Sequence, residues 1–127
     1  MSAPHSEKRR FPRYPIDVRV SVVSMRRGAL ARSNVRSIEI GEAGLSITSP
    51  LEFPIGENVD IEFTLPESRV MMRVKSVIRN RNGFRYGIEF LSLSEAQRLD
   101  IRAIGEKNLR AAQASAPAGS ASAEASN

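Results

Sequence analysis

Cysteine and tryptophan are absent from this chain of 127 residues, and histidine occurs once, at His5. Without cysteine there can be no disulfide bond, no thiolate metal site and no cysteine nucleophile. One histidine near the N-terminus leaves no Ser/His/Asp arrangement, and the carboxylates of Glu42, Asp60, Glu62 and Glu89 fall on expected strand exteriors or turns. The sequence therefore predicts neither a catalytic site nor a metal site.

Long apolar runs are also lacking. No run approaches the ~20 residues that a membrane-spanning helix needs, and no apolar segment follows the N-terminal charges as in a signal peptide. We therefore expect a cytoplasmic protein that does not insert into a membrane.

Lysine and arginine together number 19 against 14 acidic residues, and sixteen of these cations are arginine. This balance favours an acidic partner.

Both ends of the chain lack the pattern of a packed element. Residues 1–6 are polar, and residues 112–127 are rich in Ala, Ser, Pro and Gly. Such segments cannot bury enough apolar surface to order themselves, so we expect two disordered tails. The remainder is long enough for one domain, which we place at residues 7–105.

The middle of the chain alternates apolar and polar residues, which is typical of strands with one buried face. The six expected strands are 16–23, 30–40, 45–48, 59–65, 70–78 and 84–91. Only hairpin-length turns join these strands, and such short connections favour an antiparallel sheet. Closure of the sheet into a β-barrel would leave few exposed edges. Positive φ at Gly41 and Gly44 is expected in one turn, and a type I′ turn at Asn82-Gly83 in another.

A helix is expected after the last strand. Ser94 and Gln97 have the spacing of a capping box, in which each side chain accepts a hydrogen bond from the other residue's backbone N–H. The apolar residues of this segment predict the side that covers one end or flank of the barrel; they are Ala96, Leu99, Ile101, Ala103 and Ile104. Gly105 weakens the helix, which we expect to end between there and about residue 112.

A basic arm precedes the first expected strand. Between Glu7 and Pro15, three arginines and a lysine are interleaved with two aromatic residues and two prolines. The prolines disfavour a helix, so the arm is expected to be extended. Each arginine offers a planar donor fork that matches phosphate oxygens or the edge of a guanine. The arm therefore predicts an anion-binding segment.

The arm and two later segments together resemble the PilZ domain family. The resemblance lies in Arg9-x-x-x-Arg13, in the glycine turn some thirty residues later, and in the strand from Tyr86 to Phe90 that runs into Ser94-Glu95. It implies a six-stranded antiparallel β-barrel with a C-terminal helix. It also implies a non-catalytic receiver of the bacterial second messenger cyclic di-GMP, which such domains bind through RxxxR and [D/N]xSxxG.

Carried over position by position, the resemblance implies six ligand-binding residues. These are Arg9, Arg10, Arg13, Glu39, Gly41 and Gly44. Glu39 stands where the family has Asp or Asn, and its carboxylate lies one methylene further out. Gly41 replaces the serine and removes a hydroxyl, and a lost hydrogen bond of this kind weakens binding by roughly ten- to a hundredfold.

Three functions remain open at this point. The first is a cyclic di-GMP receptor whose arm folds over the barrel and which changes conformation or protein partner. The second is a degenerate PilZ adaptor that binds no nucleotide and acts through an unidentified downstream protein. The third is a single-stranded nucleic-acid binder, which the low aromatic content disfavours.

Overall fold

The computed structural model describes residues 12–126, except for the side chains of Arg26 and of residues 112–126. It contains seven strands and one helix. Their bounds are β1 Arg13–Pro15, β2 Arg19–Arg26, β3 Ala29–Gly41, β4 Gly44–Thr48, β5 Asn58–Thr64, β6 Met71–Asn82, β7 Arg85–Phe90 and α1 Glu95–Ser126.

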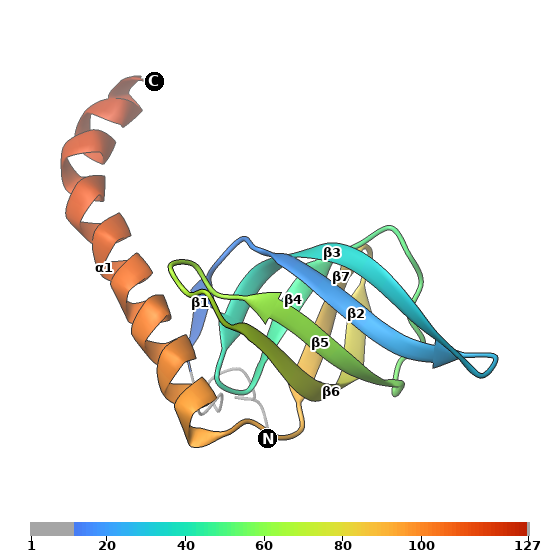
Figure 1. Ribbon diagram of the computed structural model, residues 1–127. Coiled ribbons are helices and arrows are strands. Elements are labelled where there is room, and N and C mark those ends of the chain that lie inside the picture. Colours follow the sequence, from blue (N-terminus) through green and yellow to red (C-terminus); the bar gives the residue numbers. More distant parts are fainter. Residues whose placement is uncertain (1–11, 127) are drawn as a thin grey trace, which may run out of the picture.

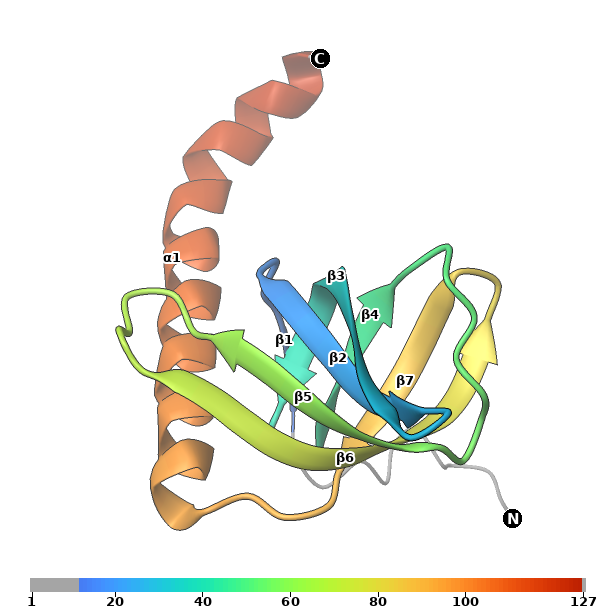
Figure 2. The same ribbon diagram turned by 45° about the vertical axis from the view of Figure 1, so that its right-hand side comes forward.

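Six of these strands close into an antiparallel barrel, as the sequence predicted (Figures 1 and 2). The sheet order is β1-β3-β2-β5-β6-β7-β4, and the additional pairing of β3 with β4 closes the ring. The short β1 lies outside the ring and pairs only with the end of β3. Closure leaves no long unpaired edge among the six barrel strands, which disfavours edge-to-edge aggregation.

The barrel core consists of the apolar members of the alternating segments. Val20 and Val22 of β2, and Ile61 and Phe63 of β5, are buried, while the intervening residues point outward. Ile16 is also buried, although it lies before the start of β2. It is not counted in β2 because its backbone N–H donates to the carbonyl oxygen of Ile38 outside the strand ladder. The period of two therefore predicted the core, with a shift at this strand's start.

The strands differ from the prediction in one end and in one turn. The strand β6 continues to Asn82, beyond the predicted end at residue 78. The β6–β7 turn is centred on Gly83 and Phe84, and of these two residues only Gly83 has positive φ, at 65°. Positive φ at the first central residue alone is the pattern of a type II′ turn, so the predicted type I′ turn is wrong.

The start of α1 agrees with the prediction, but its buried face is narrower. Gln97 N donates to Ser94 Oγ and Ser94 N donates to Gln97 Oε1, both at 3.0 Å, which forms the capping box. Of the predicted apolar side, Ile101 is buried and Ile104 is partly buried, whereas the other three residues are exposed. The reason is that α1 touches mainly β1 and β3, which cover only a narrow stripe of a helix.

The helix is also longer than expected. It continues to Ser126, where an end between residues 105 and 112 and a disordered tail from residue 112 were expected. Alanine has the highest helix propensity. A helix that has already formed its first turn adds further residues without a second nucleation cost in free energy. In Figures 1 and 2 the last turns extend away from the barrel and contact no other element.

A buried carboxylate stabilises the outer face of the barrel. Glu62 of β5 accepts hydrogen bonds from Arg32 of β3 and from Arg73 of β6, the latter at 2.6 Å, and is only 4% exposed. The hydrogen bond from Arg32 lowers the pKa of Glu62, with Arg73 acting in the same direction and burial opposing both. A lowered pKa in the folded state favours folding wherever the carboxylate is ionised.

We expect Glu62→Gln to destabilise the protein by about 1–2 kcal/mol at pH 7. This stabilisation is present above the unfolded-state pKa of about 4.3 and is lost as the pH falls through the lower folded-state pKa. The difference from the natural chain should therefore shrink towards pH 3 in urea unfolding. Glu89→Gln, which breaks the exposed pair of Glu89 with Arg79, is the control and should have a smaller effect. An equal difference at pH 7 and pH 3 would contradict this role of Glu62.

Candidate functional site

The C-terminal part of the basic arm lies on the barrel. Arg13, Tyr14 and Pro15 form β1, which pairs with the end of β3 so that Arg13 lies opposite Gly41 and Pro15 opposite Glu39. Tyr14 is buried, so its neighbours in β1 point outward. Two predicted ligand-binding residues, Arg9 and Arg10, lie outside the described residues.

Strand pairing brings small and polar residues together on the outer face beside β1. Glu39 of β3 pairs with Ser46 of β4, Ser46 pairs with Gly87 of β7, and Gly87 pairs with Asn80 of β6. Together with Arg13, these residues line a polar groove of about 350 Å³, to which Asn82 and Arg85 also contribute. Volumes of this order are typical of small-molecule sites. The strands concerned lie side by side in Figure 2.

Two arginines occupy opposite sides of this groove. Arg13 Nη1 donates a hydrogen bond of 3.1 Å to Ser46 Oγ. From β7, Arg85 Nη2 lies 3.5 Å from Glu39 Oε1, and both side chains remain partly exposed. With one carboxylate and two guanidinium groups, these three residues carry a net positive charge. The groove is therefore suited to an anion with several hydrogen-bond acceptors.

Gly41 and Gly44 have a different role from the one the turn predicted. Neither has positive φ; among the described glycines only Gly28, Gly56 and Gly83 do. Instead, the backbone comes too close for a side chain: a Cβ at Gly41 would lie 2.6 Å from the carbonyl oxygen of Pro12, and one at Gly44 would lie 2.0 Å from that of Ile88. The missing side chain at Gly41 thus allows the backbone of the arm to lie close to β3, and the missing side chain at Gly44 allows the backbone of β7 to lie close to β4.

The turn between these glycines is joined to α1. Glu42 is buried, and Arg102 of α1 donates two hydrogen bonds to its carboxylate, at 2.8 and 3.2 Å. Arg98, one turn earlier in the helix, lies 4.0 Å from the same carboxylate. A buried carboxylate held by two donors of one guanidinium is a well-oriented contact between the turn and the helix.

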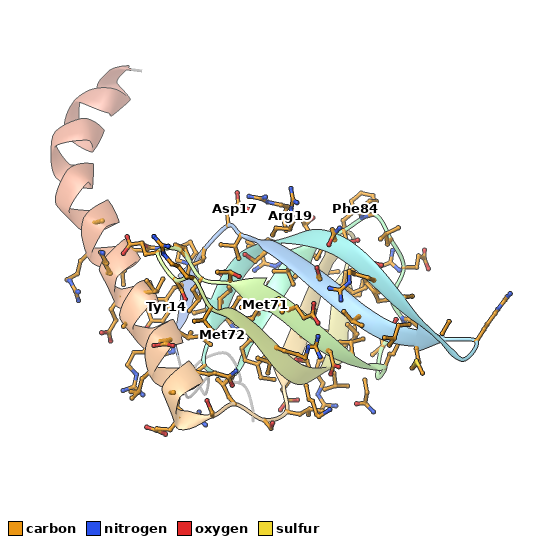
Figure 3. All side chains as sticks on the ribbon, in the orientation of Figure 1. Tyr14, Asp17, Arg19, Met71, Met72 and Phe84 are labelled. Carbon is orange, nitrogen blue, oxygen red and sulfur yellow. The ribbon has the colours of Figure 1, made fainter. Side chains whose placement is uncertain are left out.

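The arm is joined to the same helix through Tyr14. The ring packs so closely on Gly105 that a Cβ there would lie 2.1 Å from Tyr14 Cδ2. Figure 3 shows Tyr14 between β1 and α1. Burial raises the pKa of the Tyr14 phenol above its ordinary value. Because Arg102 and Gly105 are three residues apart, the turn and the arm contact one face of α1.

Two of the groove residues, Arg13 and Glu39, were predicted from the sequence as ligand-binding residues. Five were not: Ser46, Asn80, Asn82, Arg85 and Gly87. Alternation does place Ser46 and Arg85 on the outward face of their strands, because Leu45 and Tyr86 face the core. What alternation cannot supply is the register that sets Ser46 beside both Glu39 and Gly87. Gly44 is absent from the groove lining and faces Glu89 of β7 instead.

Among the helices of residues 12–126, none is both long and apolar enough to cross a membrane. Likewise, residues 12–126 contain no group of three or more His, Cys, Asp or Glu side chains placed to hold a metal ion.

Comparison with known proteins identifies similar domains. The profile described as PilZ domain matches residues 7–105. A sequence search of curated proteins gives no significant match. Among solved structures, the PilZ domain of YcgR from Escherichia coli with c-di-GMP is similar with a TM-score of 0.63 and 14% identity, covering 86% of this chain and 97% of that one.

Two further structures are similar at the same level. The inhibitor of motility MotI/DgrA from Bacillus subtilis has a TM-score of 0.64 and 14% identity, covering 87% of this chain and 57% of that one. The PilZ domain of CeSA from a cellulose synthesizing bacterium has a TM-score of 0.55 and 13% identity, covering 76% of this chain and 96% of that one. Identities this low show a common fold and nothing finer.

Proposed function

Because the chain belongs to the PilZ domain family, whose members are non-catalytic modules that bind cyclic di-GMP, we propose that it binds this dinucleotide in the groove beside β1. The observation that carries the proposal is the position of Arg13. The second arginine of the RxxxR arm lies over a polar groove together with Glu39, the first residue of the second motif. Cyclic di-GMP presents two phosphates and two guanine edges, for which arginine forks are well suited.

Binding is transmitted through α1. The arm contacts the helix through Tyr14 and Gly105, and the turn contacts it through Glu42 and Arg102. A ligand that draws the arm and the turn together therefore changes contacts on one helix face. The exposed surface of α1 is then what a downstream protein senses, in the bacterial cytoplasm where the dinucleotide acts as a messenger.

Isothermal titration of the full chain with cyclic di-GMP tests this proposal. We expect saturable binding in the micromolar range or tighter. Arg13→Ala should weaken it by roughly ten- to a hundredfold, because charge-assisted hydrogen bonds to phosphate are lost. The matched control is Arg36→Ala, since Arg36 pairs with Asp17 on the barrel surface and does not line the groove.

A flat titration at high nucleotide concentration would refute the receptor function. The alternative is then a PilZ adaptor that engages a protein without nucleotide. One observation favours this alternative: Arg85 already neutralises the Glu39 carboxylate, which is the group expected to read a guanine. Salt-dependent binding of any oligonucleotide would instead indicate a nucleic-acid binder.

A further inference from the structure

Position 41 cannot hold the serine hydroxyl of the second motif while β1 is docked as it is here. A Cβ at Gly41 would lie 2.6 Å from the Pro12 carbonyl oxygen and 3.5 Å from the Arg13 Cα atom. Both atoms belong to backbone, which cannot move aside as a flexible side chain can. A hydroxyl for the ligand must therefore come from another strand.

Ser46 is placed to provide this hydroxyl. It pairs with Glu39 across β3 and β4, so it lies directly beside the first position of the same motif. Its side chain faces the groove and accepts the hydrogen bond from Arg13. A serine that accepts from a guanidinium keeps its own O–H proton to donate, and among the described residues no acceptor takes it. Arg13 Nη1 and Ser46 Oγ–H together form a two-donor site.

Arg85 adds a second cation on the other side of the groove. It extends from β7, opposite Thr48 of β4, and contacts Glu39 at 3.5 Å. A guanidinium has five N–H donors, so contact with one carboxylate oxygen leaves others for a ligand. Arg85 also offsets the negative charge of Glu39, which would otherwise repel a phosphate.

We propose that Ser46 and Arg85 are binding residues that provide the phosphate contacts lacking at Gly41. In this arrangement Arg13 and the Ser46 hydroxyl hold one phosphodiester oxygen, and Arg85 reaches the ligand from the β7 side. The inference rests on the proposed function and concerns how this chain binds a phosphodiester with a glycine at position 41. It assigns the recognition to residues on β4 and β7, outside both family motifs.

Titrations of cyclic di-GMP into Ser46→Ala and Arg85→Ala test the assignment, with thermal unfolding measured for each variant. We expect each substitution to weaken binding roughly tenfold or more while the melting temperature changes little. Ser21→Ala is the matched control for the hydroxyl, because Ser21 is a hydrogen-bonded serine on the outer face of β2. Arg36→Ala is the control for the charge, and both controls should bind as the natural chain does.

A second ligand distinguishes contact from a structural effect. In the phosphorothioate analogue of cyclic di-GMP, sulfur replaces a phosphate oxygen and accepts hydrogen bonds poorly. The loss caused by Ser46→Ala should be smaller with this analogue, whereas a structural defect would weaken both ligands equally. An equal loss for both ligands would overturn the role of Ser46.

The remaining outcomes separate this inference from the proposed function. If the natural chain binds, Arg13→Ala binds more weakly, and Ser46→Ala and Arg85→Ala bind normally, the receptor function stands and the inference is wrong. If Gly41→Ser restores binding to the Ser46→Ala protein, position 41 can hold a hydroxyl, and the premise that the hydroxyl must come from another strand is wrong. If the natural chain itself does not bind, both are refuted.

Discussion

Gly44→Ala is expected to destabilise the barrel by about 3 kcal/mol, at the upper end of the usual cost of overpacking. The added Cβ would lie 2.0 Å from the Ile88 carbonyl oxygen and 3.1 Å from the Glu89 Cα atom, both in the backbone of β7. The overlap is relieved only by separating β4 from β7, and this pairing is part of the ring. Thermal unfolding should show a melting temperature lower by roughly 10 °C or more.

Gly28→Ala serves as the control for this substitution. Gly28 has a φ of 80°, and a Cβ there would meet no atom within 4 Å, so alanine adds only backbone strain. That strain should cost about 1–2 kcal/mol. If Gly44→Ala were no more destabilising than Gly28→Ala, the close approach of β4 and β7 would not be a constraint. Gly44 would then be free to act in ligand binding.

The Gly44 result also affects how binding data are interpreted. Family resemblance alone would attribute a loss of nucleotide binding in Gly44→Ala to a lost ligand contact. Gly44 does not line the groove, however, and its neighbour across the sheet is Glu89. We therefore expect binding and stability to fail together in this variant, whereas Arg13→Ala should affect binding alone.

The sequence predicted the barrel well because its determinants are local. Alternation in each segment identified the buried face, and turn-length connections favoured antiparallel pairing. The pairings of β2 with β5 and of β4 with β7 join strands that are not consecutive, and no local pattern predicted them. The capping box was equally local, since Ser94 and Gln97 are three residues apart. The length of α1 was not predicted, because composition indicated disorder where alanine also favours helix extension.

The candidate site was less predictable because strand register assembles it. Arg13 and Ser46 are 33 residues apart, and their hydrogen bond depends on two pairings, of β1 with β3 and of β3 with β4. The same holds for Glu39 and Arg85. Local pattern could show that each points outward, but it could not show that they meet. For Gly41 and Gly44, the sequence suggested turn conformation where the cause is close backbone contact between strands.

The helix contacts both halves of the proposed site, the arm and the turn, which also pair directly with each other through β1 and β3. Glu42 is held by Arg102, and Tyr14 lies on Gly105, so both contacts fall within one turn of α1. A ligand that prefers one arrangement of these contacts must, by reciprocity, bind more tightly when α1 is already held in that arrangement. Substitutions in α1 that never touch the nucleotide should therefore alter its affinity.

Gly105→Ala is the substitution for which this coupling gives the sharpest prediction. In a free helix, alanine in place of glycine stabilises by about 1 kcal/mol. Here the new Cβ would overlap the Tyr14 ring, with three ring carbons between 2.1 and 2.5 Å away. We expect a net loss of about 1–2 kcal/mol, since overpacking outweighs helix propensity. Affinity for cyclic di-GMP should fall too, because displacing Tyr14 moves Arg13.

A double-mutant cycle with Tyr14→Ala tests the cause of that loss. Tyr14→Ala alone should cost about 3 kcal/mol, because it leaves a cavity between β1 and α1. In that background the ring is gone, so Gly105→Ala should become stabilising by up to about 1 kcal/mol. The control Ala103→Gly, at an exposed position of α1, should destabilise equally in both backgrounds. If Gly105→Ala destabilised both proteins equally, the arm and the helix would not be coupled through Tyr14, and transmission would depend on Glu42 and Arg102 alone.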